Sequence, residues 1–211
     1  MRKILSVLLA LCLIVGLTAC SGGSSEEAAD ADNTAETAAE EQTEAPESEE
    51  SGSGSETLVV YFSATGNTKE VAEKIASVTG ADIYEIKAFE EYTEDDLSYN
   101  SSTSRTTNEQ NDPTCRPAIG SETIDISSYK TVYLGYPIWW GDAPRIMDTF
   151  VEAYDFEGKT VIPFCTSDNS GIGNSGKDLE TLAGSGTWLE GQRFAAGVSE
   201  DEVRAWVEGL E

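Results

Sequence analysis

The stretch LVVYF-SATGNT, residues 58–68, decides the fold of this chain. Residues 58–62 form an unbroken apolar run, which is typical of a strand buried on both of its faces. Residues 63–68 are small and polar, and they lead directly into a pattern with apolar residues at helical spacing that closes at Gly80. The stretch therefore predicts a buried strand, a tight loop and a helix.

The same alternation continues along the rest of the chain. Apolar runs rich in β-branched residues predict further strands, and helical patterns separate them. Strand and helix alternate four or five times, which predicts an α/β fold with a parallel sheet and helices on both faces. Ligands of such sheets lie beyond the carboxyl ends of the strands. The further strands are predicted at residues 82–87, 131–135 and 160–164, with a weaker candidate at residues 188–194.

Three of the later helices have recognisable start signals. A side-chain oxygen just before a helix can accept from free backbone N–H groups, and a carboxylate three residues later strengthens the signal. Proline is tolerated in the first turn. The predicted caps are Asp142, with Pro144 in the first turn, Ser175 with Asp178, and Ser199 with Glu202.

The loop at residues 63–68 has the features of an anion-binding site. Gly66 permits a tight turn and a close backbone approach. The helix that follows offers free N–H groups and the positive end of its dipole. The loop lacks the lysine of a nucleoside-triphosphate loop, so a monophosphate held by neutral donors fits it better. The alternative is a plain helix start, in which the hydroxyls bond only to their own backbone.

Two more loops follow predicted strands. Residues 135–142, GYPIWWGD, contain Trp139 and Trp140, whose wide rigid faces suit a flat apolar ligand. Both rings could instead belong to the core, and we expect one to point inward and one toward the site. Residues 165–174, CTSDNSGIGN, are polar and rich in glycine, and their place beyond a neighbouring strand makes them a candidate edge of the same ligand site.

Together these three loops resemble the flavin-binding loops of the flavodoxin family, and the likeness covers residues 57–211. The resemblance implies a flavodoxin-like three-layer sandwich, with a five-stranded parallel sheet of order 2-1-3-4-5, noncovalent FMN and electron transfer. It implies phosphate contacts from Ser63, Thr65, Gly66, Asn67 and Thr68. It also implies isoalloxazine contacts from Pro137, Ile138, Trp139 and Trp140, with Thr166, Ser167 and Gly171 at the other edge of the ring.

Residues 89–120 form a long stretch between the second and third predicted strands, and the sequence does not assign their chemistry. On a structural interpretation the stretch packs over the sheet edge, with Arg105 or Arg116 in ion pairs. On a functional interpretation it covers the flavin and shapes a pocket for a partner or substrate.

The first 19 residues are typical of a secretory signal. Arg2 and Lys3 precede an apolar run at residues 4–17, which is shorter than the roughly 20 residues of a membrane-spanning helix. The run ends in LTAC-SGG, which resembles the lipobox of bacterial lipoproteins and implies a lipid on Cys20. The alternative is an ordinary signal peptide with an incidental cysteine.

Residues 20–56 predict a disordered tether. Residues 21–56 hold twelve acidic residues and no lysine or arginine, so they cannot bury enough apolar surface to offset the entropy of ordering. Residues 57–211 then have the size of one domain. We expect a secreted protein, lipid-anchored to the outer face of the cytoplasmic membrane or of another cell-envelope membrane, with that lipid as its only membrane contact.

Charge and composition exclude several function classes. The formal net charge is −26, of which residues 57–211 contribute −16, so nucleic-acid phosphates would be repelled. This charge would suit a basic redox partner, although solubility explains it equally well. The chain has no histidine and no cluster with metal-ligand spacing, so we predict neither a catalytic residue nor a metal site. A disulfide between Cys115 and Cys165 is allowed outside the cytoplasm but is not implied.

Three functions follow from these expectations. The first is an electron carrier in which FMN supplies the redox chemistry, with the second reduction step at low potential because acidic groups disfavour the anionic reduced ring. The second is an FMN-dependent reductase that uses NAD(P)H and a quinone-type acceptor. The third is a binding module that keeps the fold without FMN.

Overall fold

The computed structural model describes residues 54–210. The predicted signal, Cys20 and nearly all of the predicted tether lie outside the described residues. Within residues 54–210, no helix combines the length and the apolar character needed to span a membrane.

The sheet is entirely parallel, and its order confirms the prediction. The strands follow one another as β2-β1-β3-β4-β5, and β6 also pairs with β4. The order reverses between β1 and β3, which is the place where such sheets bind ligands. The strands are β1 Thr57–Phe62, β2 Asp82–Ile86, β3 Thr131–Pro137, β4 Thr160–Thr166, β5 Thr187–Trp188 and β6 Gln192–Phe194.

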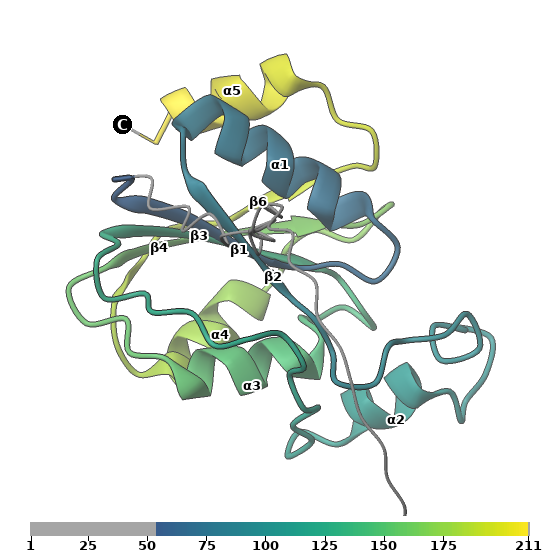
Figure 1. Ribbon diagram of the computed structural model, residues 1–211. Coiled ribbons are helices and arrows are strands. Elements are labelled where there is room, and N and C mark those ends of the chain that lie inside the picture. Colours follow the sequence, from purple (N-terminus) through teal and green to yellow (C-terminus); the bar gives the residue numbers. More distant parts are fainter. Residues whose placement is uncertain (1–53, 211) are drawn as a thin grey trace, which may run out of the picture. The chain divides into compact units, whose positions relative to one another are not determined.

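Helices cover both faces of this sheet, as Figure 1 shows. Helices α1, Asn67–Thr79, and α5, Glu200–Glu208, lie on one face. Helices α3, Arg145–Ala153, and α4, Ser175–Ala183, lie on the other. The short helix α2, Arg105–Asn111, belongs to the stretch at residues 89–120 and lies outside these layers (Figure 1).

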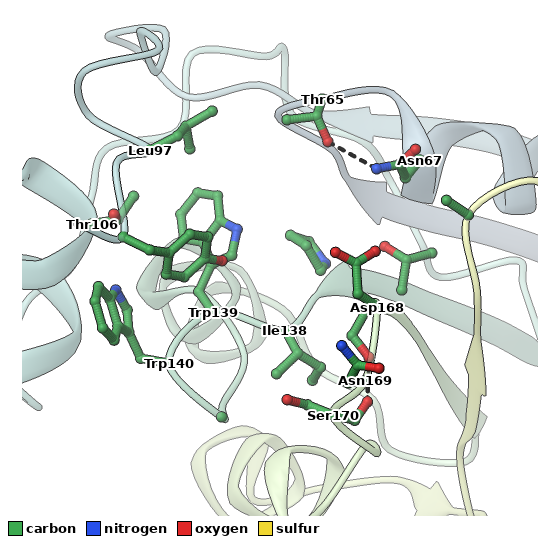
Figure 2. A pocket seen from close by; sticks show the side chains of 16 residues that line it. Thr65, Asn67, Leu97, Thr106, Ile138, Trp139, Trp140, Asp168, Asn169 and Ser170 are labelled. Atoms are coloured by element: carbon green, nitrogen blue, oxygen red, sulfur yellow. Dashed lines mark hydrogen bonds between the residues drawn. The ribbon is translucent and has the colours of Figure 1, made fainter.

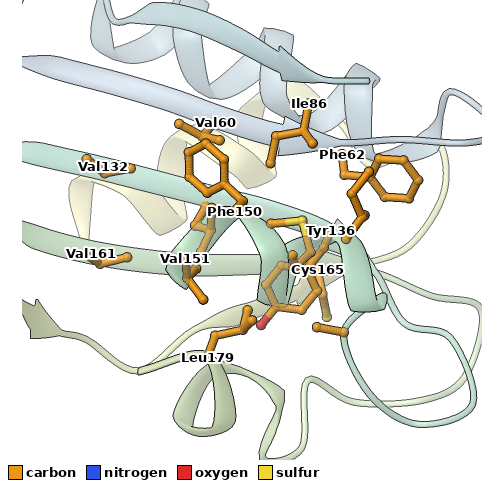
Figure 3. Packing of buried hydrophobic residues seen from close by; sticks show 14 of the residues in the cluster. Val60, Phe62, Ile86, Val132, Tyr136, Phe150, Val151, Val161, Cys165 and Leu179 are labelled. Atoms are coloured by element: carbon orange, nitrogen blue, oxygen red, sulfur yellow. The ribbon is translucent and has the colours of Figure 1, made fainter. Parts of the chain in front are cut away.

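The two layers divide the side chains of β1 by the alternation of a strand. Leu58, Val60 and Phe62 are buried toward α3 and α4, whereas Val59 and Tyr61 are buried toward α1 and α5. Figure 3 shows Val60 and Phe62 in the first of these two clusters. A strand with apolar residues on both faces reads as a continuous apolar run because neither face meets water. The apolar run at residues 58–62 is therefore explained by burial of β1 on both faces, as its sequence predicts.

Gly135 in β3 is required by the packing of its neighbour. It lies beside Phe164 of β4 in the strand register, and a Cβ added to Gly135 would lie 2.1 Å from Cζ of the Phe164 ring. The ring thus lies directly over the glycine backbone. The glycine at the start of the GYPIWWGD stretch is therefore explained by core packing and not by ligand binding.

The prediction of one final strand at residues 188–194 is wrong, because the structure has two short strands, β5 and β6. Thr187 N donates to the carbonyl oxygen of Lys159, just before β4, at 2.8 Å, and Leu189 N donates to that of Val161 in β4 at 2.9 Å. Pro163 follows at the same two-residue spacing but has no N–H to donate, so the ladder is interrupted opposite it. Pairing resumes beyond Pro163, where β6 lies beside residues 164–166.

Only one of the three predicted caps is correct. Ser199 accepts a hydrogen bond from Glu202 N at 3.2 Å and caps α5. Helix α3 instead begins after Pro144, because the Asp142 carboxylate accepts from the adjacent Ala143 N at 2.8 Å. Helix α4 begins after Asn174 without a side-chain cap, because the hydroxyl of Ser175 donates to Ile172 O at 2.6 Å.

Cys115 and Cys165 are both free thiols. Cys165 is buried in β4, and this burial raises the pKa of its thiol to about 12. The disulfide that the sequence left open is therefore not formed in this structure, and Cys165 acts as a small apolar core residue.

Candidate functional site

The loops that follow β1, β3 and β4 meet around one cavity of about 480 Å³, which lies in the size range of small-molecule sites. Figure 2 shows Trp139 and Trp140 on one side of this cavity, with Asp168, Asn169 and Ser170 on the other. The lining residues predicted from sequence are Thr65, Asn67, Pro137, Ile138, Trp139, Trp140, Thr166 and Ser167. The remaining lining residues are Leu97, Tyr99, Thr106, Gly141, Asp168, Asn169, Ser170 and Ala196.

The first turn of α1 reaches this cavity without a side-chain cap. Gly66 is its N-cap residue, with a φ of 89°, and no side chain bonds to the free N–H groups of the first turn. Asn67 Nδ2 donates to Thr65 Oγ1 at 3.2 Å, so both side chains are held at the rim (Figure 2). The helix therefore presents unpaired N–H groups and a positive dipole end, which suit an anion.

Ser63 and Thr68 shape this loop and do not line the cavity. Ser63 Oγ accepts from Gly66 N at 3.1 Å, which closes the turn. Thr68 is buried, and its hydroxyl shares a 2.7 Å hydrogen bond with that of Thr166. The two hydroxyls thus serve the protein, and the donors left for a ligand at this end are mainly backbone N–H groups.

The two adjacent tryptophans have different environments, as their sequence predicts. Trp139 is buried and packs edge-on against Phe62 and Tyr92, with ring centroids 5.5 and 5.1 Å away. Trp140 is 45% exposed and contacts the exposed Tyr99, with centroids 5.0 Å apart. Both tryptophans line the cavity, so even the buried one contributes an edge to the site.

Trp140 lies in a strained turn. Trp139 N donates to Asp142 O at 2.9 Å and Asp142 N donates to Trp139 O at 3.0 Å, so the two residues between them form a tight turn. Trp140 has a φ of 54° and Gly141 a φ of 89°, which together give a type I′ geometry. Trp140 is the one non-glycine residue with positive φ among residues 54–210. Strain of this kind is held where a site needs a side chain in a fixed direction.

The third loop is closed by its own hydrogen bonds. The Ser167 hydroxyl donates to Ser170 O, and Ser167 N donates to Phe194 O at 3.2 Å. Asp168 is the one charged residue in the cavity lining. Burial raises the pKa of Tyr99, and the nearby Asp168 carboxylate raises it further; both residues line the cavity. Gly171 lies outside the lining.

The stretch at residues 89–120 has ion-paired arginines, as its structural interpretation expects, and it also contributes to the cavity lining. Arg105 Nε bonds to Glu109 at 2.7 Å, and Arg116 bonds to Glu152 at 2.7 Å, so both arginines are in ion pairs. Leu97, Tyr99 and Thr106 nevertheless line the cavity. Nothing in the spacing of these three residues distinguishes them, because their positions follow from the path of an irregular segment.

Burial also fixes the protonation of Tyr92, which supports Trp139 from this stretch. Tyr92 OH donates to Glu109 at 2.8 Å, and the Arg105 guanidinium lies 4.0 Å from its ring centre. Burial and the nearby Glu109 raise the pKa of Tyr92, so the ring stays neutral. Within the part of the chain that the structure describes, no group of three or more potential ligands could hold a metal ion.

The described domain matches a known protein family. The flavodoxin family model matches residues 56–210, which is most of the chain. The chain belongs to the flavodoxin family. A candidate flavoprotein from Bacteroides uniformis is 43% identical and aligns over 72% of this chain and 97% of its own, with a TM-score of 0.69. One from Bacteroides eggerthii is 45% identical over 73% of this chain and 96% of its own, with a TM-score of 0.68.

A more distant match shows the flavodoxin fold alone. It is a flavoprotein from Lactobacillus acidophilus, solved in complex with FMN, which is 22% identical over 72% of this chain and 97% of its own, with a TM-score of 0.55. Comparison with the curated proteins gave no match. The described domain corresponds to almost the whole of each aligned flavoprotein, so such a flavodoxin domain folds without further chain.

The strain at Trp140 gives a testable prediction. Trp140→Gly and Trp140→Ala both lose the contact with Tyr99, but only glycine adopts a positive φ without steric cost. We expect Trp140→Gly to be more stable than Trp140→Ala by about 1 kcal/mol in urea unfolding without added ligand.

The matched control is the same exchange inside a helix. At Ala76 of α1, Ala76→Gly should lower stability by about 1 kcal/mol relative to the unchanged chain. A Trp140→Ala protein as stable as Trp140→Gly would contradict the left-handed turn.

Proposed function

We propose that this flavodoxin domain binds FMN in the cavity formed by the loops after β1, β3 and β4. The observation that carries the proposal is that one cavity contains both a site for an anion and a wall for a flat ring. An uncapped helix start lies at one end, and the Trp139–Trp140 wall lies at the other. The FMN bound by the Lactobacillus acidophilus flavoprotein supports the same ligand.

The residues present fit the two parts of FMN. The lining holds no lysine or arginine, so the phosphate would be held by the N–H groups at the start of α1 with Thr65 and Asn67. The ring would lie against Pro137, Ile138 and the exposed face of Trp140. Thr166 and the loop that begins at Ser167 would close its other edge, as the resemblance to flavodoxins implies. FMN supplies the redox chemistry, and the chain supplies binding and orientation.

The phosphate end is tested with Asn67→Asp. This change keeps the shape of the side chain and places a carboxylate at the start of α1, where a negative charge favours the helix itself. It should repel the FMN phosphate and weaken FMN binding by about tenfold or more. Riboflavin lacks the phosphate, so its affinity should stay the same. The measurement is fluorescence titration with both flavins.

The matched control is Asn174→Asp at the start of α4, which lies outside the cavity lining. It makes the same chemical change and should leave both affinities unaltered. Equal weakening of FMN and riboflavin by Asn67→Asp would show that the phosphate binds elsewhere. If the unchanged chain bound neither flavin, the domain would be a binding module that has kept the flavodoxin fold without FMN.

We further propose that the domain is an electron carrier with a basic redox partner. The charge of −16 over residues 57–211 supports attraction to a basic surface. With Asp168 as the one charge in the lining, the site should disfavour the anionic reduced ring. An anaerobic reductive titration should then give a second reduction potential below that of free FMN. A potential at or above that of free FMN would contradict this proposal.

A second candidate function is an FMN-dependent NAD(P)H:quinone-type reductase, and one observation favours it. A further cavity of about 590 Å³ shares Tyr99 and Trp140 with the first, and Gln110, Asp142 and Arg145 contribute to its lining. It offers room for a substrate next to the proposed ring. In the same preparation, steady-state oxidation of NADH or NADPH with a quinone would support the reductase, and its absence would support the carrier.

We also propose that Cys20 carries a lipid that anchors the protein outside the cytoplasm. The support is the LTAC-SGG sequence with the acidic residues 21–56 behind it. Cys20→Ser should move the protein from the membrane fraction to the soluble fraction and abolish labelling by a radioactive fatty acid. Cys165→Ser, which leaves the lipobox intact, is the control. Unaltered membrane association of Cys20→Ser would contradict lipidation.

A further inference from the structure

Arg193 in β6 binds the loop after β4 on the side that faces away from the cavity lining. Its Nε donates to Ser167 O at 3.1 Å, and its Nη2 donates to the same oxygen at 2.5 Å and also to Asp168 O. Nε also lies 3.4 Å from the Ser167 hydroxyl. Two successive backbone carbonyls therefore share one guanidinium, although Arg193 itself does not line the cavity.

Peptide geometry determines what this arrangement does to the other side of the loop. In a trans peptide the C=O and the next N–H point in opposite directions. With the carbonyls of Ser167 and Asp168 turned toward Arg193, the N–H groups of Asp168 and Asn169 point away from it. Both residues line the cavity, and within residues 54–210 neither N–H group has an acceptor.

Two successive N–H groups on one side of a loop form a concave donor pair that suits an oxygen with negative charge. We propose that Arg193 is a positioning residue that holds this donor pair toward the ring end of the flavin. This inference rests on the proposed FMN site. The pyrimidine edge of a flavin carries two carbonyl oxygens, and such an edge would accept from the Asp168 and Asn169 N–H groups.

The guanidinium suits this role through both its shape and its charge. Its fixed fork of donors serves two carbonyls at once, which the point charge of a lysine does less well. Its positive charge lies on the carbonyl side of the two peptide groups whose N–H groups are the proposed donors. Because it polarises these peptide groups, it strengthens their N–H groups as donors. A cation there also favours the anionic reduced ring, so Arg193 opposes the effect of Asp168 on the second reduction potential.

The test compares Arg193→Gln and Arg193→Lys with the unchanged domain, residues 54–211. Arg193→Gln should lower the affinities for FMN and for riboflavin by the same factor, about tenfold or more. The reason is that the flavin ring, which both ligands share, loses its hydrogen-bond donors. It should also shift the second reduction potential to a more negative value. Arg193→Lys should restore the potential and part of the affinity. Arg204→Gln removes an exposed cation from α5 and should change neither.

Unaltered flavin affinity in Arg193→Gln, or a loss confined to FMN, would overturn the inference. Hydrogen exchange without flavin tests the same contact independently of the proposed function. The Ser167 amide, bonded to Phe194 O, should exchange about tenfold faster in Arg193→Gln, and an unaltered rate would overturn the inference. A domain that binds neither flavin but shows this faster exchange would refute the proposed function alone. If Arg193→Gln does not fold, the partial loss expected for Arg193→Lys is the deciding result.

Discussion

Parallel pairing at the carboxyl ends of β3 and β4 is the constraint on which the site depends. The register brings Pro137 beside Thr166, so the loops that follow these strands leave the sheet at the same level. The buried hydrogen bond between Thr68 and Thr166, at 2.7 Å, then ties the start of α1 to the end of β4 across the intervening β3. Three segments far apart in sequence are thus held around one cavity by a strand register and a single pair of hydroxyls.

Most side-chain hydroxyls in these loops are used to hold the loops themselves. Ser63 closes the turn before α1, Thr68 bonds to Thr166, and Ser167 bonds to Ser170 O. The donors left for a ligand are therefore mainly backbone N–H groups, at the start of α1 and, by the argument from Arg193, in the third loop. Backbone donors carry no net charge, which lets a strongly acidic domain hold an anionic ligand without placing a lysine or arginine in the cavity lining.

The sequence predicts those features that follow from local pattern. The apolar run at residues 58–62 gives β1, because burial on both faces leaves no polar alternation. The break between β5 and β6 was missed because it depends on the neighbouring strand, where Pro163 has no N–H to donate. The cap at Asp142 failed for a similar reason, since a turn with Trp139 and the adjacent Ala143 N already uses this residue. Tyr99 and Leu97 reach the cavity only through the path of an irregular segment, which no periodicity encodes.

Hydrogen bonds and a ring contact join the Trp140 turn to the stretch at residues 89–120. Gln110 Nε2 donates to Trp139 O, at the start of the turn, at 2.8 Å and to Ala143 O, just after the turn, at 3.1 Å. Tyr99 from the same stretch contacts Trp140 from the open side. The wall between the two cavities is therefore built from both segments, because Tyr99 and Trp140 line both. The shape of the first cavity therefore depends on the stretch at residues 89–120 as well as on the loop after β3.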